Sequence, residues 1–177
     1  MPGEEVVTSG ASLGNVIVFV SEGLTGRNFE VPQQPVVLEQ RDCMYRPHVL
    51  ALQANQKLEI VNHDNTTHNI HPTPANNREW NKAQPPGVKV EDSFSREEIA
   101  IPVKCNVHPW MRGYIAVFKH PYFAVTTTDG GFRLPDLPPG EYTIEAWHEK
   151  LGTVSKKITI VPGQSQTLEF VFRSHGG

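Results

Sequence analysis

Two short segments of this chain hold most of the side chains that could do chemistry: DNTTHNIH at residues 64–71 and CNVHPWMRG at residues 105–113. In the second segment, Cys105, His108 and Met111 recur every third residue on one short loop, which can wrap a single ion. His68 follows a strand-like segment that a β-sandwich can place beside that loop. A site that exchanges one electron quickly must hold Cu(I) and Cu(II) in nearly the same geometry. Two imidazoles, one thiolate and a weak axial thioether meet this need, so the four residues are candidate copper ligands.

The pattern of these motifs resembles a known family. HNIH followed by C-x-x-H-P-x-M-R-G is similar to the amicyanin branch of the cupredoxins, which are relatives of plastocyanin. The likeness covers approximately residues 36–119 and includes the lead-in Tyr45-x-Pro47 and the approach Asn62-His63-Asp64 to the first histidine. It implies a Greek-key β-sandwich and a single mononuclear (type 1) copper ion that cycles between Cu(I) and Cu(II).

The resemblance also implies a role for each site residue. His68 and His108 are the expected imidazole ligands, Cys105 the thiolate and Met111 the axial ligand. Asn69 is expected to tie the His68 strand to the Cys105 loop, because such outer bonds hold metal ligands in place. A cupredoxin fold that has lost or changed its metal is the main rival. Zinc is a lesser one, because a thioether is a poor zinc ligand.

Cys43 and His48 lie near the lead-in motif and have several interpretations. Cys43 could be a second thiolate ligand, a disulfide partner of Cys105 or an inert buried thiol, and a disulfide would abolish the copper site. His48 could supplement the site or be a surface histidine. Pro109 and Trp110 could shape the loop as a hydrophobic lid, or form an apolar patch beside His108 where an electron partner docks.

The rest of the chain predicts an all-β protein without a convincing helix. Apolar β-branched runs between Gly and Pro turns predict strands at 16–20, 36–38, 48–53, 57–63, 93–94, 98–103, 114–119, 124–127, 132–134, 142–148, 156–161 and 167–172. Residues 72–93 have no periodicity and are expected to form a long loop, with Trp80 as a packing anchor.

The C-terminal segment resembles a second family. TTTDGGFRLPDLPPGEYTIEAW is similar to the transthyretin-like module called carboxypeptidase regulatory-like, a non-catalytic β-sandwich. That module normally opens with an apolar strand, which residues 121–177 do not offer. The run VIVFV at 16–20 is similar to this strand, so we expect residues 1–27 to complete the sandwich of 121–177, with the cupredoxin domain of 28–120 inserted between them. The alternative is an extra strand on the cupredoxin domain itself.

Composition limits the classes of partner. The net charge of −3 gives no basis for binding nucleic acid, and no apolar run is long enough for a membrane span. No secretory signal is expected at the start of the chain. The motifs of hydrolases and of phosphate-binding loops do not occur, and the scattered histidines build no clear second copper site, so no catalytic residues are expected.

Three functions therefore compete. The first is an electron carrier, or an electron-carrying subunit, that operates in the periplasm or elsewhere outside the cytoplasm. Its partner would be a redox protein such as a c-type cytochrome or a membrane electron-transfer complex. The second is a structural accessory subunit of such a complex, with a cupredoxin fold but no functional copper. The third is a copper enzyme or copper-handling protein.

Overall fold

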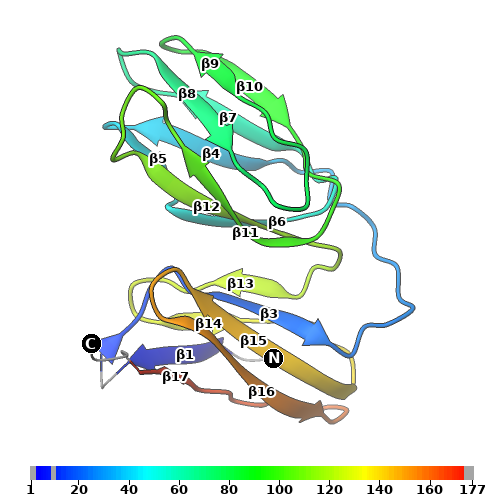
Figure 1. Ribbon diagram of the computed structural model, residues 1–177. Coiled ribbons are helices and arrows are strands. Elements are labelled where there is room, and N and C mark those ends of the chain that lie inside the picture. The colour runs from blue at the N-terminus through cyan, green and yellow to red at the C-terminus, as the bar shows by residue number, and fades with distance from the viewer. Residues whose placement is uncertain (1–2, 9–10, 174–177) are drawn as a thin grey trace. The chain divides into compact units, whose positions relative to one another are not determined.

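The computed structural model describes residues 3–8 and 11–173, and the described part of the chain contains strands and no helix. The all-β expectation is confirmed. The chain forms two compact units, one of residues 28–121 and one of residues 1–27 with 122–177 (Figure 1). The described residues also contain no helix that is long and apolar enough to cross a membrane.

The unit of residues 28–121 is a sandwich of two sheets. One sheet has the order β10-β7-β4-β5 and the other the order β6-β12-β11-β8-β9. The strands are β4 (Val36–Arg41), β5 (Met44–Arg46), β6 (Val49–Gln53), β7 (Leu58–Asn62), β8 (His68–Pro72), β9 (Lys82–Gln84), β10 (Lys89–Asp92), β11 (Glu98–Lys104) and β12 (Arg112–Phe118). Two pairs, β4 with β7 and β6 with β12, are parallel, so the chain crosses between the sheets instead of running as simple hairpins.

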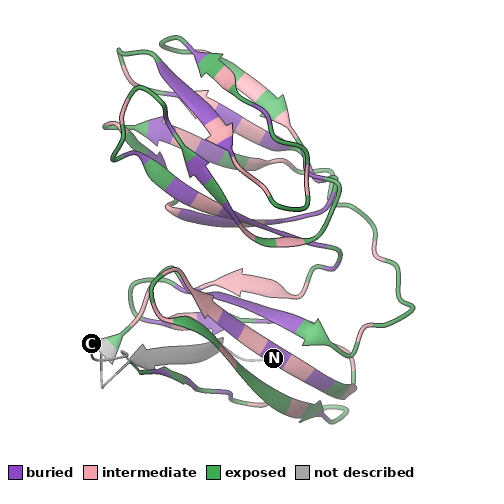
Figure 2. Cartoon of the chain, viewed as in Figure 1, coloured by how far each residue is buried: buried purple, intermediate pink, exposed green. Residues whose placement is uncertain are grey.

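Alternation of side chains builds the core of this unit. In β7, Leu58, Ile60 and Asn62 are buried while Glu59 and Val61 are partly exposed, because successive side chains of a strand point to opposite faces (Figure 2). Trp80 packs in the core with its ring stacked on Phe94, the two centroids 5.9 Å apart, as a packing anchor should.

The sequence interpretation of residues 72–94 was wrong in part. This segment is not a long loop, because it contains β9 and β10, and the strand expected at 93–94 lies instead at 89–92. Both strands lie at sheet edges, where few side chains are apolar, so the hydrophobic pattern hides them. Phe94 gave the misleading signal: it enters the core from a segment that is not a strand.

The other unit also has two sheets, with the orders β13-β3-β15-β16 and β14-β1-β17, and β2 pairs with β1. Its strands are β1 (Gly3–Thr8), β2 (Ala11–Ser12), β3 (Ile17–Glu22), β13 (Phe123–Val125), β14 (Gly131–Arg133), β15 (Gly140–His148), β16 (Gly152–Ile160) and β17 (Phe170–Phe172). The expected strand at 16–20 is β3, which pairs antiparallel with β13 on one side and with β15 on the other. The chain thus leaves this unit after β3, forms residues 28–121 and returns at β13.

The central place of β3 follows from its composition. Residues 16–20 are all buried, and Val16, Val18 and Val20 point into the core that the C-terminal strands form. A run of apolar residues such as 16–20 belongs inside a sheet, because an exposed apolar edge would favour aggregation.

Candidate metal centre

The loop between β11 and β12 has a closed, hydrogen-bonded shape. Lys104 pairs with Arg112, so the last residues of the hairpin fix where Cys105 and Met111 emerge. The Cys105 N–H donates to the Met111 carbonyl at 3.2 Å, and the Met111 N–H donates to the His108 carbonyl at 3.0 Å. The backbone of the loop therefore curls back on itself.

Strand β8 supplies the remaining imidazole. His68 is its first residue, and β8 pairs with β11 through His71 opposite Lys104. This pairing brings the start of β8 beside the loop that follows β11.

Three donor atoms converge there. Donor atoms of His68, Cys105 and His108 all lie within 4.8 Å of one another. His68 Nδ1 is 3.1 Å from His108 Nδ1, and Cys105 Sγ is 3.7 Å from His108 Nδ1. Donors around one ion in a trigonal plane, with bonds of about 2.0–2.3 Å, lie roughly 3.5–4 Å apart. The spacing in this group therefore fits a single ion with small adjustments.

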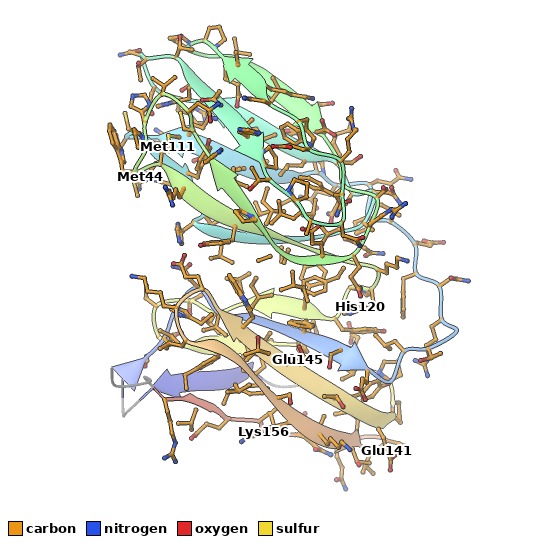
Figure 3. The ribbon with its side chains drawn as sticks, in the orientation of Figure 1. Met44, Met111, His120, Glu141, Glu145 and Lys156 are labelled. Atoms are coloured by element: carbon orange, nitrogen blue, oxygen red, sulfur yellow. The ribbon has the colours of Figure 1, made fainter. Side chains whose placement is uncertain are left out.

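Burial distinguishes the four expected ligands. His68 and Met111 are fully buried, Cys105 is 3% exposed, and His108 is partly exposed. Figure 3 places Met111 at the end of this unit where β5 begins. The donors are thus shielded from water, and the ring of His108 is their contact with the surface.

The orientation of His68 is set by a carboxylate. Its Nε2 lies 2.7 Å from Asp64 Oδ2, so Nε2–H donates to Asp64 and the lone pair of Nδ1 faces the other donors. Asp64 is held in turn by the N–H groups of Asp42 at 2.7 Å and Cys43 at 2.9 Å. Burial works to raise the pKa of Asp64, but the hydrogen bonds from the Cys43 backbone and the His68 ring outweigh it, and the pKa lies below its ordinary value.

Asn69 joins the two segments, at the place where sequence similarity expects such a bond. Its Oδ1 accepts from the Asn106 N–H at 2.7 Å and from the Cys105 thiol at 3.3 Å. Its Nδ2 donates to Asn81 Oδ1 at 2.8 Å, and Tyr45 donates to its carbonyl at 2.6 Å. The thiol of Cys105 and the strand of His68 are therefore tied through one buried amide.

Cys43 and Cys105 are both free thiols, so no disulfide joins them. Cys43 is only partly buried, and it groups with Asp64 and His68 instead of with Cys105 and His108. Burial, followed by the nearby Asp64 charge, raises the pKa of the Cys43 thiol. The disulfide alternative is therefore wrong, and Cys43 is a partly buried thiol instead of a fully buried one.

The remaining expected residues lie around the site. His48 does not belong to a donor group of the described residues; its Nδ1 lies 3.1 Å from the Arg112 carbonyl. Pro109 is exposed and Trp110 is 61% exposed. The Trp110 ring packs against His108 with centroids 5.0 Å apart, and its Nε1–H donates to the Cys43 carbonyl at 3.1 Å.

Sequence reasoning did not single out Asp64 as a partner of His68. Asp64 precedes His68 by four residues. This spacing alone does not show that the two side chains face each other. Sequence reasoning also did not predict that two apolar side chains are exposed: Val107 is 58% exposed and Met44 is 40% exposed. A single apolar residue in a loop carries no signal of its exposure.

Comparisons with known proteins find both expected resemblances. Residues 115–173 match the family model described as the carboxypeptidase regulatory-like domain. A search of curated proteins finds no match. Among solved structures, the chain is similar to a purple cupredoxin from Nitrosopumilus maritimus, with 22% identity and a TM-score of 0.41 over 46% of this chain and 97% of the other.

Two further structures are similar to the chain. The reduced form of an amicyanin variant shares 19% identity and a TM-score of 0.44, over 50% of this chain and 86% of the other. A copper-containing nitrite reductase from Thermus scotoductus SA-01 shares 17% identity and a TM-score of 0.46, over 66% of this chain and 28% of the other.

Proposed function

We propose that residues 28–121 hold one copper ion on His68, Cys105 and His108, with Met111 as a weak axial ligand, and that the protein transfers single electrons. The observation that carries this proposal is the convergence of one thiol and two imidazole nitrogens within 4.8 Å at a buried position. When bound, copper supplies a one-electron couple, and a donor set of this kind suits both of its oxidation states.

Hydrogen bonds from other protein groups set the positions of the proposed ligands. The carboxylate of Asp64 selects the tautomer of His68 that leaves Nδ1 free to bind metal. Asn69 Oδ1 accepts from the Asn106 N–H, and this bond, which does not need the Cys105 proton, ties β8 to the ligand loop. Little rearrangement is then needed when the charge of the site changes by one.

The partly exposed ring of His108 is the proposed exit for the electron. Pro109, Trp110 and Val107 are exposed on the same loop, and the Trp110 ring packs against the His108 ring. A small apolar surface of this kind suits a transient encounter with a redox protein, such as a c-type cytochrome or a membrane electron-transfer complex. We place the protein outside the cytoplasm and assign it no catalytic residues.

Copper loading tests the proposal. Addition of Cu(II) to the metal-free protein should give one intense thiolate-to-copper band in the visible region, at one ion per chain. Cys105→Ser should lose the band, because it removes the thiolate. A folded wild-type protein that gives no such band would support the role of a structural subunit without copper.

A further inference from the structure

The opposite edge of the His68 ring faces a second set of possible metal donors. Cys43, Asp64 and His68 each offer one ligand atom, and these atoms all lie within 4.8 Å of one another. Nε2 is the ring nitrogen that faces Asp64, whereas Nδ1 faces His108. The two donor groups therefore share one imidazole and use different nitrogens of it.

The backbone holds this second group together. Asp42 and Cys43 form the two-residue turn between β4 and β5, and both have a φ of 55°. In this turn the N–H groups of both residues donate to the two carboxylate oxygens of Asp64. The turn thereby keeps Cys43 beside the carboxylate, and the carboxylate beside His68.

The donor types indicate the class of ion. One sulfur, one carboxylate oxygen and one imidazole nitrogen are the three kinds of ligand that Zn²⁺ binds, and a water can complete its tetrahedron. Cys43 and Asp64 are partly exposed, whereas His68 is fully buried. Two of the three donor residues are therefore in contact with solvent, from which an ion can reach the group.

We propose that Cys43, Asp64 and His68 form a second metal site, which takes Zn²⁺ or a similar thiophilic divalent ion. The site does not depend on the proposed electron transfer, because it uses neither Cys105 nor His108. Binding forms bonds from the ion to Cys43 Sγ, one Asp64 oxygen and His68 Nε2. The thiol proton goes to solvent, and the Nε2 proton goes to Nδ1 or, where copper occupies Nδ1, to solvent as well. In that last case His68 bridges the two ions as an imidazolate.

Cobalt is the probe that tests the site. The chain has two cysteines, so Cys105→Ser leaves Cys43 as its only thiol. In this variant, one equivalent of Co²⁺ should give a thiolate-to-cobalt band in the near ultraviolet, and Zn²⁺ should displace it. Addition of Cys43→Ser should remove the band. Addition of Asp64→Asn should weaken Co²⁺ binding about tenfold or more, since even outer-shell partners of a metal contribute that much to affinity.

Two control variants locate the ion. His108→Ala in the Cys105→Ser background should keep the band, because His108 belongs only to the other donor group. Asp42→Asn removes a nearby charge without removing a ligand and should change Co²⁺ affinity little. A band that survives Asp64→Asn at full strength, or that disappears with His108→Ala, would overturn the proposal.

The copper-loaded wild type provides a second measurement in case the Cys105→Ser variant does not fold. Zn²⁺ should slow alkylation of Cys43 in this protein and should shift the visible copper band. Alkylation at an unchanged rate with Zn²⁺ in excess would refute the second site. Absence of the copper band before zinc is added would count against the proposed electron transfer alone.

Discussion

Asp64→Asn is the sharpest test of how the protein prepares its histidine ligand. Three donors converge on this carboxylate: the N–H groups of Asp42 and Cys43, and Nε2–H of His68. An asparagine offers one acceptor oxygen in place of two and turns an NH₂ group toward at least one of these donors. Hydrogen bonds to charged groups contribute about 1.5–3 kcal/mol, so we expect the free energy of unfolding of this unit to fall by about 2 kcal/mol at pH 7.

The effect should depend on pH in a definite direction. The pKa of Asp64 lies below its ordinary value in the folded protein, so the charged carboxylate stabilises the fold. This contribution is fully present above the unfolded pKa of about 3.9, and it is lost as pH falls through the lower folded pKa. The difference between wild type and variant should therefore be largest near neutrality and shrink below about pH 4.

The assay is urea unfolding of the metal-free protein, together with copper affinity measured by chelator competition. We expect affinity to fall by about 10–100-fold, the usual cost of losing a partner that orients a metal-binding histidine. Asp42→Asn is the matched control, because it removes the same charge from the neighbouring turn between β4 and β5, where the Asp42 side chain is 74% exposed. If both variants unfold and bind copper alike, Asp64 does not orient His68.

Three further predictions concern other parts of the chain. Cys105→Ala should abolish coloured copper binding while circular dichroism shows an intact β fold, whereas Cys43→Ala should leave the copper band nearly unchanged; a lost band in the second variant would make Cys43 a ligand of the same ion. Trp110→Ala should slow electron exchange with a c-type cytochrome in stopped-flow measurements without changing the copper band, and an unchanged rate would remove Trp110 from the docking surface. Gly23→Ala should lower the thermal midpoint of the unit formed by residues 1–27 and 122–177, because a Cβ there would lie 2.5 Å from Cδ1 of Tyr142 and the φ of Gly23 is +115°. Overpacking of this kind costs about 1–3 kcal/mol. An unchanged midpoint would contradict this account.

The parts of the site that could be predicted are those whose geometry is local. Cys105, His108 and Met111 lie on one short loop, so their spacing predicts that they lie close together, and the donor atoms of Cys105 and His108 do lie within 4.8 Å of each other. His68 required the assumption that its strand pairs beside the loop, and β8 does pair with β11. The strongly apolar strands could also be located, since alternation marks their buried faces.

The parts that could not be predicted depend on contacts distant in sequence. Cys43 and Asp64 meet because a turn between β4 and β5 donates two backbone hydrogen bonds to a carboxylate on another loop. The residue types alone do not predict this contact. The sequence therefore suggested Cys43 as a ligand of the ion that Cys105 would bind, and not as a neighbour of Asp64. The edge strands β9 and β10 were also not predicted. Their polar and charged side chains suit a sheet edge, so their sequences show no alternation of apolar residues.

The arrangement of bonds around the donors explains why this site suits a one-electron couple. Two imidazoles and a thiol without hydrogen-bond partners would be free to rotate away from a common point. Here different contacts hold the donors: Asp64 holds the His68 ring, Asn69 holds the loop of Cys105 through the Asn106 N–H, and the loop has its own backbone bonds. Because these hydrogen bonds lie within the protein, we expect the donor positions to change little between the two oxidation states of the proposed copper ion. A small change in geometry would favour the fast electron transfer that we propose.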